Sequence, residues 1–443
     1  MNSSCLSRIG LSFVAVFLIL VGCTKGVVPS YSIYGFSFWP FVDGGAADGS
    51  PPYILSPSQA PVSQNLNGQL LMISARGSFG GFNSFYYNGN ENAPTWFSPG
   101  SFSEQTTPGL VSNPSLAVLN SNAYSAWIEV NTGTNPGVTQ VHVAELIGTT
   151  WTGIDQNPTC GGVSCTNSLP TQSANSLALV SSNLGLSLFW SENFAGINQI
   201  RGVYSTTGGT TPGWTPLVSG VNSFANLSGT NSGFGPQAVA FNSKIYLAWA
   251  EYVGGNAAPA QIQVAVSSDG INFQNVSGGL SAMSESDPAG AMTPYLAVNN
   301  NKLYIAWVGY FSGISLVRGA VYNGNDASPS WAFIDGGGSL NIASSVVVSS
   351  PQLISYNNQL FATWIQPLPS GVGQVRLASY NGNDASPSWQ YADGGGTTGL
   401  NFNTNINALF PTLINFNGHL YSAWEEFNSG SGLPDLTRVR HIF

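Results

Sequence analysis

The sequence predicts an all-β protein, a β-propeller of seven blades in which each blade is a four-stranded antiparallel sheet. The twelve tryptophans fall on two interleaved series with a spacing of about 60 residues. Short runs of alternating apolar residues lie between them, separated by Asn, Gly and Pro. No stretch after the first 34 residues has the period of a helix. Seven copies of such a unit form a closed ring of blades.

The clearest copy of the unit lies between residues 351 and 396. Its expected strands are 351–356, 359–366, 374–380 and 389–393, and the segments between them are rich in Asn, Gly and Pro. One tryptophan series lies in the expected second strands, with Ser74 in one place: Ser74, Trp127, Trp190, Trp249, Trp307, Trp364 and Trp424. The other series begins the expected fourth strands, with Phe273 in one place: Trp39, Trp96, Trp151, Trp214, Phe273, Trp331 and Trp389. We expect most of these rings to form the core between blades.

The two ends of the chain predict how the ring closes. After Trp424 the sequence has only one more strand, 438–443, and then ends. An isolated fourth-strand pattern, Phe38–Gly45, precedes the first full unit and matches the pattern that starts at Trp331. The N-terminal strand should therefore complete the seventh, C-terminal blade, which removes an exposed sheet edge. The predicted propeller spans residues 35–443.

Residues 1–22 predict an export signal, with Arg8 before a short apolar run from Ile9 to Leu20. The sequence Leu20-Val-Gly-Cys23 that follows resembles the lipobox of bacterial lipoproteins. The resemblance implies lipidation at Cys23, a linker over residues 23–34, and a protein held by acyl chains at the outer membrane or cell surface.

Two further cysteines, Cys160 and Cys165, enclose a short Gly-rich loop. In an exported chain the expected arrangement is a disulfide. The alternative is a metal site, which needs further ligands, and no other Cys or His lies within about fifteen residues. We therefore predict a disulfide.

Composition limits the partners. Charged residues make up only 7% of the chain, and the net charge is −9 with ten basic residues. This balance argues against nucleic acid and against an anionic lipid surface, and it suits a neutral ligand such as a glycan. The spacing of His142, His419 and His441 predicts no metal site, and no motif indicates a cofactor. We expect a monomeric propeller.

Two rings of polar residues are expected near the face on which propellers usually bind ligands. The second-strand ring, two residues beyond the tryptophans, is Arg76, Glu129, Glu192, Glu251, Gly309, Gln366 and Glu426. The third-strand ring, aligned through a Val-x-x-Ala pattern, is Asn83, His142, Arg201, Gln263, Arg318, Arg376 and Arg440. Five of the seven arginines belong to these rings.

The two rings have two interpretations. Opposite charges that face each other across antiparallel strands stabilise a sheet by roughly 0.2–1 kcal/mol. Guanidinium and carboxylate groups close to aromatic rings also suit hydroxyl-rich ligands. The candidate ligand-binding residues are Arg76, His142, Glu192, Arg201, Glu251, Arg318, Arg376, Glu426 and Arg440.

The segment Ser267-Ser-Asp269-Gly-Ile-Asn-Phe273 resembles the Asp box of sialidase-like propellers, and Asn-Gly-Asn-Asp loops stand in the same place in other units. The resemblance covers most of the chain and implies a structural, turn-stabilising role for Asp269. A sialidase needs three arginines around one carboxylate, whereas the arginines here fall in separate blades. No catalytic residues are therefore predicted.

The sequence favours a binding protein at the cell envelope, with a glycan or a protein partner on one propeller face. A glycoside hydrolase that acts on polysaccharide is an alternative, because Glu129, Glu192, Glu251 and Glu426 share a face. A structural platform in an envelope assembly is the other alternative.

Overall fold

The structure, a computed structural model, describes most of the chain from residue 59 onward. The described ranges are 59–75, 81–91, 93–102, 110–133, 135–155, 165–168, 171–208, 213–217, 225–254, 259–279, 290–311, 313–336, 338–341, 347–395, 399–427 and 436–443. The predicted signal, linker and N-terminal strand lie outside these ranges, as do Arg76 and Cys160.

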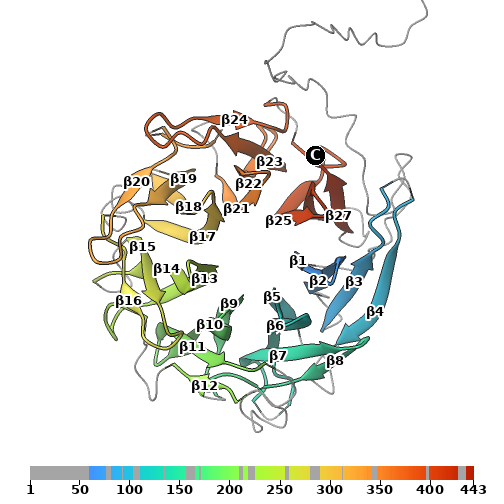
Figure 1. The fold of residues 1–443 in the computed structure, drawn as a ribbon, viewed down its shortest axis with the longest axis vertical. Coiled ribbons are helices and arrows are strands. Elements are labelled where there is room, and N and C mark those ends of the chain that lie inside the picture. Colours follow the sequence, from blue (N-terminus) through green and yellow to red (C-terminus); the bar gives the residue numbers. More distant parts are fainter. Residues whose placement is uncertain are drawn as a thin grey trace, which may run out of the picture. The chain divides into compact units, whose positions relative to one another are not determined.

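The described residues form seven antiparallel sheets arranged as blades around a central axis, as predicted (Figure 1). Blade 1 contains β1 (Gln59–Leu66), β2 (Gln69–Ala75), β3 (Phe82–Tyr87) and β4 (Trp96–Phe102). Blade 2 contains β5 (Val111–Leu119), β6 (Asn122–Val130), β7 (Thr139–Ile147) and β8 (Thr150–Gly153). Blade 3 contains β9 (Ala174–Ser182), β10 (Gly185–Phe194), β11 (Ile197–Ser205) and β12 (Thr215–Pro216).

The remaining blades repeat this order. Blade 4 contains β13 (Gly233–Phe241), β14 (Lys244–Tyr252), β15 (Ala260–Ser267) and β16 (Gln274–Asn275). Blade 5 contains β17 (Ala291–Asn299), β18 (Lys302–Phe311), β19 (Ile314–Tyr322) and β20 (Trp331–Phe333). Blade 6 contains β21 (Ser349–Tyr356), β22 (Gln359–Pro367), β23 (Gly373–Tyr380) and β24 (Trp389–Tyr391). Blade 7 contains β25 (Asn407–Phe416), β26 (His419–Phe427) and β27 (Leu436–His441).

Tight turns join the first two strands of each blade. In blades 5 and 6 two consecutive asparagines with positive φ form the turn, Asn300-Asn301 and Asn357-Asn358. Asparagine tolerates this left-handed conformation, which matches the twist of a hairpin. In these two blades the asparagine pair therefore sets the register between the first and second strands.

The second-strand tryptophans are core residues, as the sequence predicts. Trp127, Trp190, Trp249, Trp307, Trp364 and Trp424 are all 0% exposed. The described residues contain seven buried apolar clusters, and each draws on two neighbouring blades. Burial of a large aromatic side chain contributes a few kcal/mol, so these seams supply much of the stability.

The fourth-strand tryptophans also join blades, through hydrogen bonds. The indole Nε1 of Trp214 donates to the carbonyl oxygen of Ile154, and Trp389 donates to that of Ile334, each in the preceding blade. Stacked blades thus share hydrogen bonds as well as apolar surface.

The ring closes between blade 7 and blade 1. Met72 and Tyr87 of blade 1 pack with Phe416, Tyr421 and Val439 of blade 7 in one buried cluster. Blade 7 has three strands among the described residues, and the N-terminal strand predicted to complete it lies outside them. Within the described ranges, no helix is long and apolar enough to cross a membrane.

The Asp-box segment is a turn, as its resemblance implies. The Oδ1 atom of Asp269 accepts hydrogen bonds from the backbone nitrogens of Ile271 (2.8 Å) and Asn272 (2.7 Å). These bonds lower the pKa of Asp269 below its ordinary value, with the hydrogen bond from the Asn272 nitrogen the largest cause. Gly270 supplies the positive φ that the turn requires.

Candidate functional site

The first strands of all seven blades line a cavity of about 630 Å³ along the axis of the ring. β1, β5, β9, β13, β17, β21 and β25 face the centre in Figure 1. None of the residues that line the cavity carries a charge. Ser, Gln, Asn, Thr and Tyr side chains alternate with aliphatic ones, and the volume lies in the range of small-molecule sites.

A ring of β-bulges surrounds one end of this cavity. In five blades two residues of the first strand, the second of them a proline, lie opposite one second-strand tryptophan. The five pairs are Asn113-Pro114, Gly235-Pro236, Thr293-Pro294, Ser350-Pro351 and Phe410-Pro411. Blade 1 has the same bulge at Ala60-Pro61, opposite Ser74. Proline fits a bulge because the bulged position makes no ladder hydrogen bond.

Two of these bulges hold side chains in a strained backbone conformation. Thr293 has a φ of 51° and Phe410 a φ of 49°. A β-branched or bulky residue rarely adopts positive φ, and such strain clusters at functional sites. Phe410 is 41% exposed, so an aromatic face is presented to solvent beside the bulge.

The residues that follow the six prolines line the cavity. We call them the mouth ring: Val62, Ser115, Gln237, Tyr295, Gln352 and Thr412. Two of them serve the fold. Ser115 Oγ accepts a hydrogen bond from Leu179 N, and Gln237 Oε1 accepts one from Leu296 N, each in the next blade.

Tyr295 and Gln352 differ from these two mouth-ring residues. Within the described residues their side chains have no hydrogen bond to protein, and both are half-buried. Burial raises the pKa of the Tyr295 hydroxyl above its ordinary value, and the hydroxyl can donate and accept hydrogen bonds. Blades 5 and 6 therefore present one hydroxyl and one amide to the cavity.

The second-strand ring holds loops in place. The Nε1 atoms of Trp190 and Trp249 each donate to the carboxylate two residues further on, Glu192 and Glu251, at 2.7 Å. Glu192 also accepts a hydrogen bond from the backbone nitrogen of Ser168, which lies in the loop that enters the same blade. The carboxylate thus connects the core tryptophan to the loop above it.

The same connection recurs in other blades. Glu251 accepts from Leu227 N and Glu426 accepts from Phe402 N. Burial raises the pKa of both carboxylates against the opposing hydrogen bonds, and for Glu426 also against the charge of Arg438. In blade 5 Gly309 replaces the carboxylate, and among the described residues Trp307 Nε1 has no hydrogen-bond partner.

Three members of the third-strand ring are paired with a buried aspartate of their own blade. The guanidinium Nε of Arg318 lies 2.6 Å from Asp335 Oδ2, and that of Arg376 lies 2.5 Å from Asp393 Oδ2. His142 Nδ1 lies 3.0 Å from Asp155 Oδ2. Each aspartate follows a fourth-strand tryptophan by four residues, so a Trp-x-x-x-Asp pattern marks these pairs in the sequence.

Arg201 has a different partner. Its Nη2 atom donates to Gln199 Oε1 at 2.5 Å, and the side chain is buried. Burial lowers the pKa of Arg201, and the negative charge of Glu192 opposes this effect. The register pairs Glu192 with Gln199 and Arg201 with Trp190, so the two charges are not directly opposite each other.

The structure corrects the alignment of the third-strand ring in blade 7. Arg438, and not Arg440, lies opposite Trp424, as Arg376 lies opposite Trp364. Arg440 lies opposite Ser422 and donates to the carbonyl oxygen of Leu400. Burial lowers its pKa to about 10. Positions two apart in a strand point to the same face, so the sequence pattern fits either arginine.

The predicted ligand-binding residues that the structure describes are thus buried and engaged within the protein. Ligand binding by His142, Glu192, Arg201, Glu251, Arg318, Arg376, Glu426 and Arg440 stays a prediction, and Arg76 lies outside the described residues. The mouth ring was missed, although a proline near the start of six first strands was its signal in the sequence.

Cys165 is fully buried beside the third strand of blade 2, where the nitrogen of the next residue, Thr166, donates to the carbonyl oxygen of Val141. Its predicted partner Cys160 lies outside the described residues, so the disulfide stays a prediction.

Solved structures with a similar fold include glycan-processing enzymes. The chain is similar to a Trypanosoma rangeli sialidase in complex with the inhibitor DANA, at 11% identity over 77% of this chain and 58% of that chain, with a TM-score of 0.46. It is also similar to a Penicillium chrysogenum α-L-arabinanase complexed with arabinobiose, at 13% identity over 75% of this chain and 93% of that one, with a TM-score of 0.47.

No family model and no curated protein sequence matches the chain. The chain spans 58% of the length of the sialidase. At these identities and TM-scores the similarity concerns the propeller fold alone: the chain is a seven-bladed propeller whose structural neighbours are sialidases and an arabinanase.

Proposed function

We propose that this propeller binds a neutral oligosaccharide at the mouth ring, where the first strands begin. The observation that carries the proposal is the uncharged cavity of about 630 Å³, bordered by Tyr295 and Gln352. Sugar hydroxyls need donors and acceptors in fixed positions, and sugar rings pack on aromatic faces. The half-buried Tyr295 supplies such a face in the lining that also holds the Gln352 amide, and Phe410, two residues before the mouth-ring residue Thr412, is exposed.

Binding fits the lining better than cleavage does. Glycoside hydrolysis by the common route uses two carboxyl groups about 5–9.5 Å apart that flank the scissile bond. The residues that line the cavity include no Asp or Glu, and Glu192, Glu251 and Glu426 are buried behind the loops that they anchor. A hydrolase that acts on polysaccharide is the alternative function, with its acids supplied by loops around the mouth.

The test is a titration of the full chain with neutral oligosaccharides and with matched anionic ones. We expect neutral ligands to bind, and we expect Tyr295→Phe and Gln352→Ala each to weaken binding about tenfold, the loss of one hydrogen bond. Neither change should alter the melting temperature by more than a degree or two. Gln237→Ala is the matched control: it should lower the melting temperature, because it removes the acceptor for Leu296 N.

Neutral oligosaccharides that fail to bind, or that bind both variants as tightly as the parent, contradict the proposal. New reducing ends released during the titration support the hydrolase alternative.

We further propose that the protein acts at the cell envelope, held by lipid at Cys23. The support is the lipobox-like sequence before Cys23. Cys23→Ser should release the protein from the membrane fraction, and a variant that stays there after a salt wash would argue against the anchor.

A further inference from the structure

The loop between the third and fourth strands carries a carboxylate to the preceding blade. At the seam between blades 4 and 5, Asp326 lies 2.5 Å from Lys244 Nζ and accepts hydrogen bonds from the hydroxyls of Tyr246 and Tyr322. Lys244 and Tyr246 belong to blade 4, whereas Asp326 and Tyr322 belong to blade 5. One carboxylate thus joins two blades through a lysine and two tyrosines.

The seam between blades 5 and 6 repeats this arrangement. Asp384 lies 2.5 Å from Lys302 Nζ and accepts a hydrogen bond from Tyr380 at 3.0 Å. The lysines occupy the first position of β14 and of β18, directly after the turn. The sequence repeat therefore supplies a fixed positive charge to each carboxylate.

The seam between blades 7 and 1 departs from this arrangement. Glu91 takes the carboxylate position, and Tyr421 donates a hydrogen bond to its Oε1 at 2.8 Å. His419, the first residue of β26, occupies the position that Lys244 and Lys302 occupy in β14 and β18. A second imidazole, His441, lies opposite Tyr421, where the equivalent residues of blades 4 and 5 are valines, Val266 and Val321.

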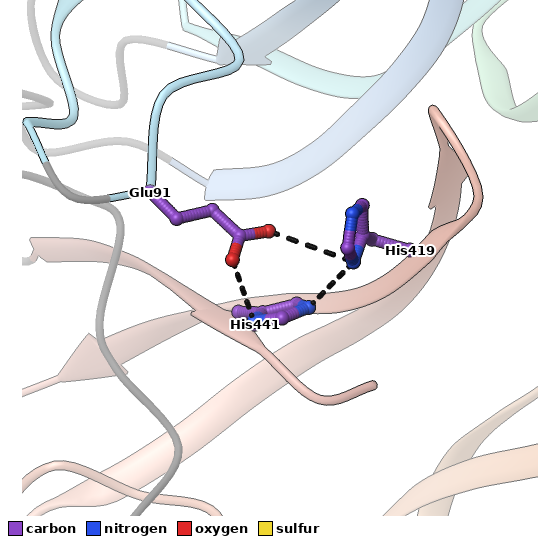
Figure 2. Close-up of side chains that lie close together, drawn as sticks. All are labelled: Glu91, His419 and His441. Carbon is purple, nitrogen blue, oxygen red and sulfur yellow. Dashed lines mark hydrogen bonds and ion pairs between the residues drawn. The ribbon is translucent and has the colours of Figure 1, made fainter.

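The three side chains converge on one point (Figure 2). His419 Nδ1 lies 3.0 Å from His441 Nε2 and 3.7 Å from Glu91 Oε1, and His441 Nδ1 lies 3.1 Å from Glu91 Oε2. One ligand atom from each residue falls within 4.8 Å of the others. A tetrahedral ion with bonds of 2.0–2.1 Å holds its ligand atoms about 3.3 Å apart. His441 faces His419 through Nε2 and Glu91 through Nδ1, so ion binding requires the side chains to turn until one nitrogen of His441 faces both partners.

We infer that Glu91, His419 and His441 bind one divalent transition-metal ion, of the Zn²⁺ type, which joins blade 7 to blade 1. Two imidazoles and one carboxylate are donors that Zn²⁺ accepts, and Mg²⁺ prefers oxygen ligands. The side chains of His419, Glu91 and His441 are 45%, 25% and 17% exposed, so an ion can reach them from solvent.

The surroundings are those of a metal site. The Tyr421 hydroxyl orients the Glu91 carboxylate, the role that outer-shell partners play around metal ligands. Three protein ligands at a partly exposed position leave room for a water molecule as the fourth. The ion supplies the positive charge that Lys244 supplies between blades 4 and 5 and that Lys302 supplies between blades 5 and 6.

The experiment uses the untagged full chain, freed of metal with a chelator and titrated with ZnCl₂ or MgCl₂. We expect one Zn²⁺ per chain by calorimetry and no heat from Mg²⁺. Zinc at about 100 times its dissociation constant should raise the melting temperature by about 3–5 °C.

His419→Lys is the decisive variant, because it rebuilds the lysine arrangement of the seams between blades 4 and 5 and between blades 5 and 6, and it removes one ligand. It should bind zinc at least 100-fold more weakly and should melt at the same temperature with and without zinc. Asp384→Asn, at the seam between blades 5 and 6, is the control and should keep the full response to zinc.

Two results would overturn the inference: no zinc binding by the folded parent, or binding by His419→Lys as tight as that of the parent. Melting curves of both proteins in chelator establish that each is folded. His441→Gln provides a second removal of one ligand and should lose the zinc response in the same way.

Discussion

At the seam between blades 7 and 1, which closes the ring, a carboxylate joins two blades as it does between blades 4 and 5 and between blades 5 and 6. The side chains that contact this carboxylate are different at the closing seam. Between blades 4 and 5 the interblade carboxylate Asp326 contacts the amino group of Lys244. Between blades 7 and 1 Glu91 meets two imidazoles. The repeat thus determines which positions contact each other between blades, whereas the residue at each position determines the chemical groups that this contact contains.

The blades at the closing seam also differ in which parts of the chain form their strands. Blades 4, 5 and 6 take all four strands from one continuous segment, whereas the described part of blade 7 has three. Contacts at the closing seam hold together parts of the chain that are far apart in sequence, such as Glu91 and Tyr421, 330 residues apart. Closure of so long a loop costs more conformational entropy than closure within a blade does.

Of the changes considered, removal of the strand predicted to close the ring should reduce the stability of the fold most. Deletion of residues 35–45 should abolish cooperative melting, because blade 7 would lose its fourth strand. Circular dichroism during heating is the measurement, and a deletion variant that melts like the parent would contradict the split blade.

Removal of one partner from an ion pair inside a blade should have the next largest effect. Asp393→Ala leaves Arg376 buried without its carboxylate, which should destabilise the fold by about 3–5 kcal/mol. Denaturant unfolding measures the change. The double variant Arg376→Met/Asp393→Ala should recover much of the loss, and a double variant no more stable than Asp393→Ala would show that the charge is not the cause.

Removal of a carboxylate that joins two blades should destabilise the fold less, because this carboxylate is partly exposed to solvent. Asp326→Ala should cost about 1–3 kcal/mol, since Lys244 and two tyrosine hydroxyls lose their acceptor. Burial tends to raise the pKa of Asp326, but the hydrogen bonds from Lys244, Tyr322 and Tyr246 outweigh it and lower the pKa below 3.8.

That pKa shift gives the Asp326 contribution a pH dependence. A lowered folded-state pKa stabilises the protein fully above the unfolded value, and the stabilisation is lost as the pH falls through the folded value. The difference in melting temperature between the parent and Asp326→Ala should therefore be constant from pH 7 to about pH 5 and should shrink below pH 4. A difference that grows on acidification would contradict this account.

Replacement of His441 at the closing seam should change the stability least when no metal ion is present. His441→Val copies the valines of blades 4 and 5, and in chelator it should change stability by no more than about 0.5 kcal/mol, as expected for a partly exposed polar pair. With zinc present the parent should become the more stable of the two. Parallel melts in chelator and in zinc measure both quantities, and a variant that stays equally stable in zinc would remove the distinction between the seams.

The sequence by itself determined the blade count, the strand order within a blade and the core. Each of these depends on a local pattern repeated about every 60 residues: a tryptophan, alternating apolar residues, and Asn or Gly at the turns. The resemblance to the Asp box implied the Asp269 turn, which is also local, because its partners lie within three residues.

Only the tertiary structure decided the sites. A shift of two residues leaves the facing pattern of a strand unchanged, so the sequence could not choose between Arg438 and Arg440 as the ring member. Burial of the arginines against Asp335 and Asp393 depends on how strands three and four align. Glu91 meets His419 and His441 because ring closure brings the first blade against the last, and a linear repeat carries no signal for that contact.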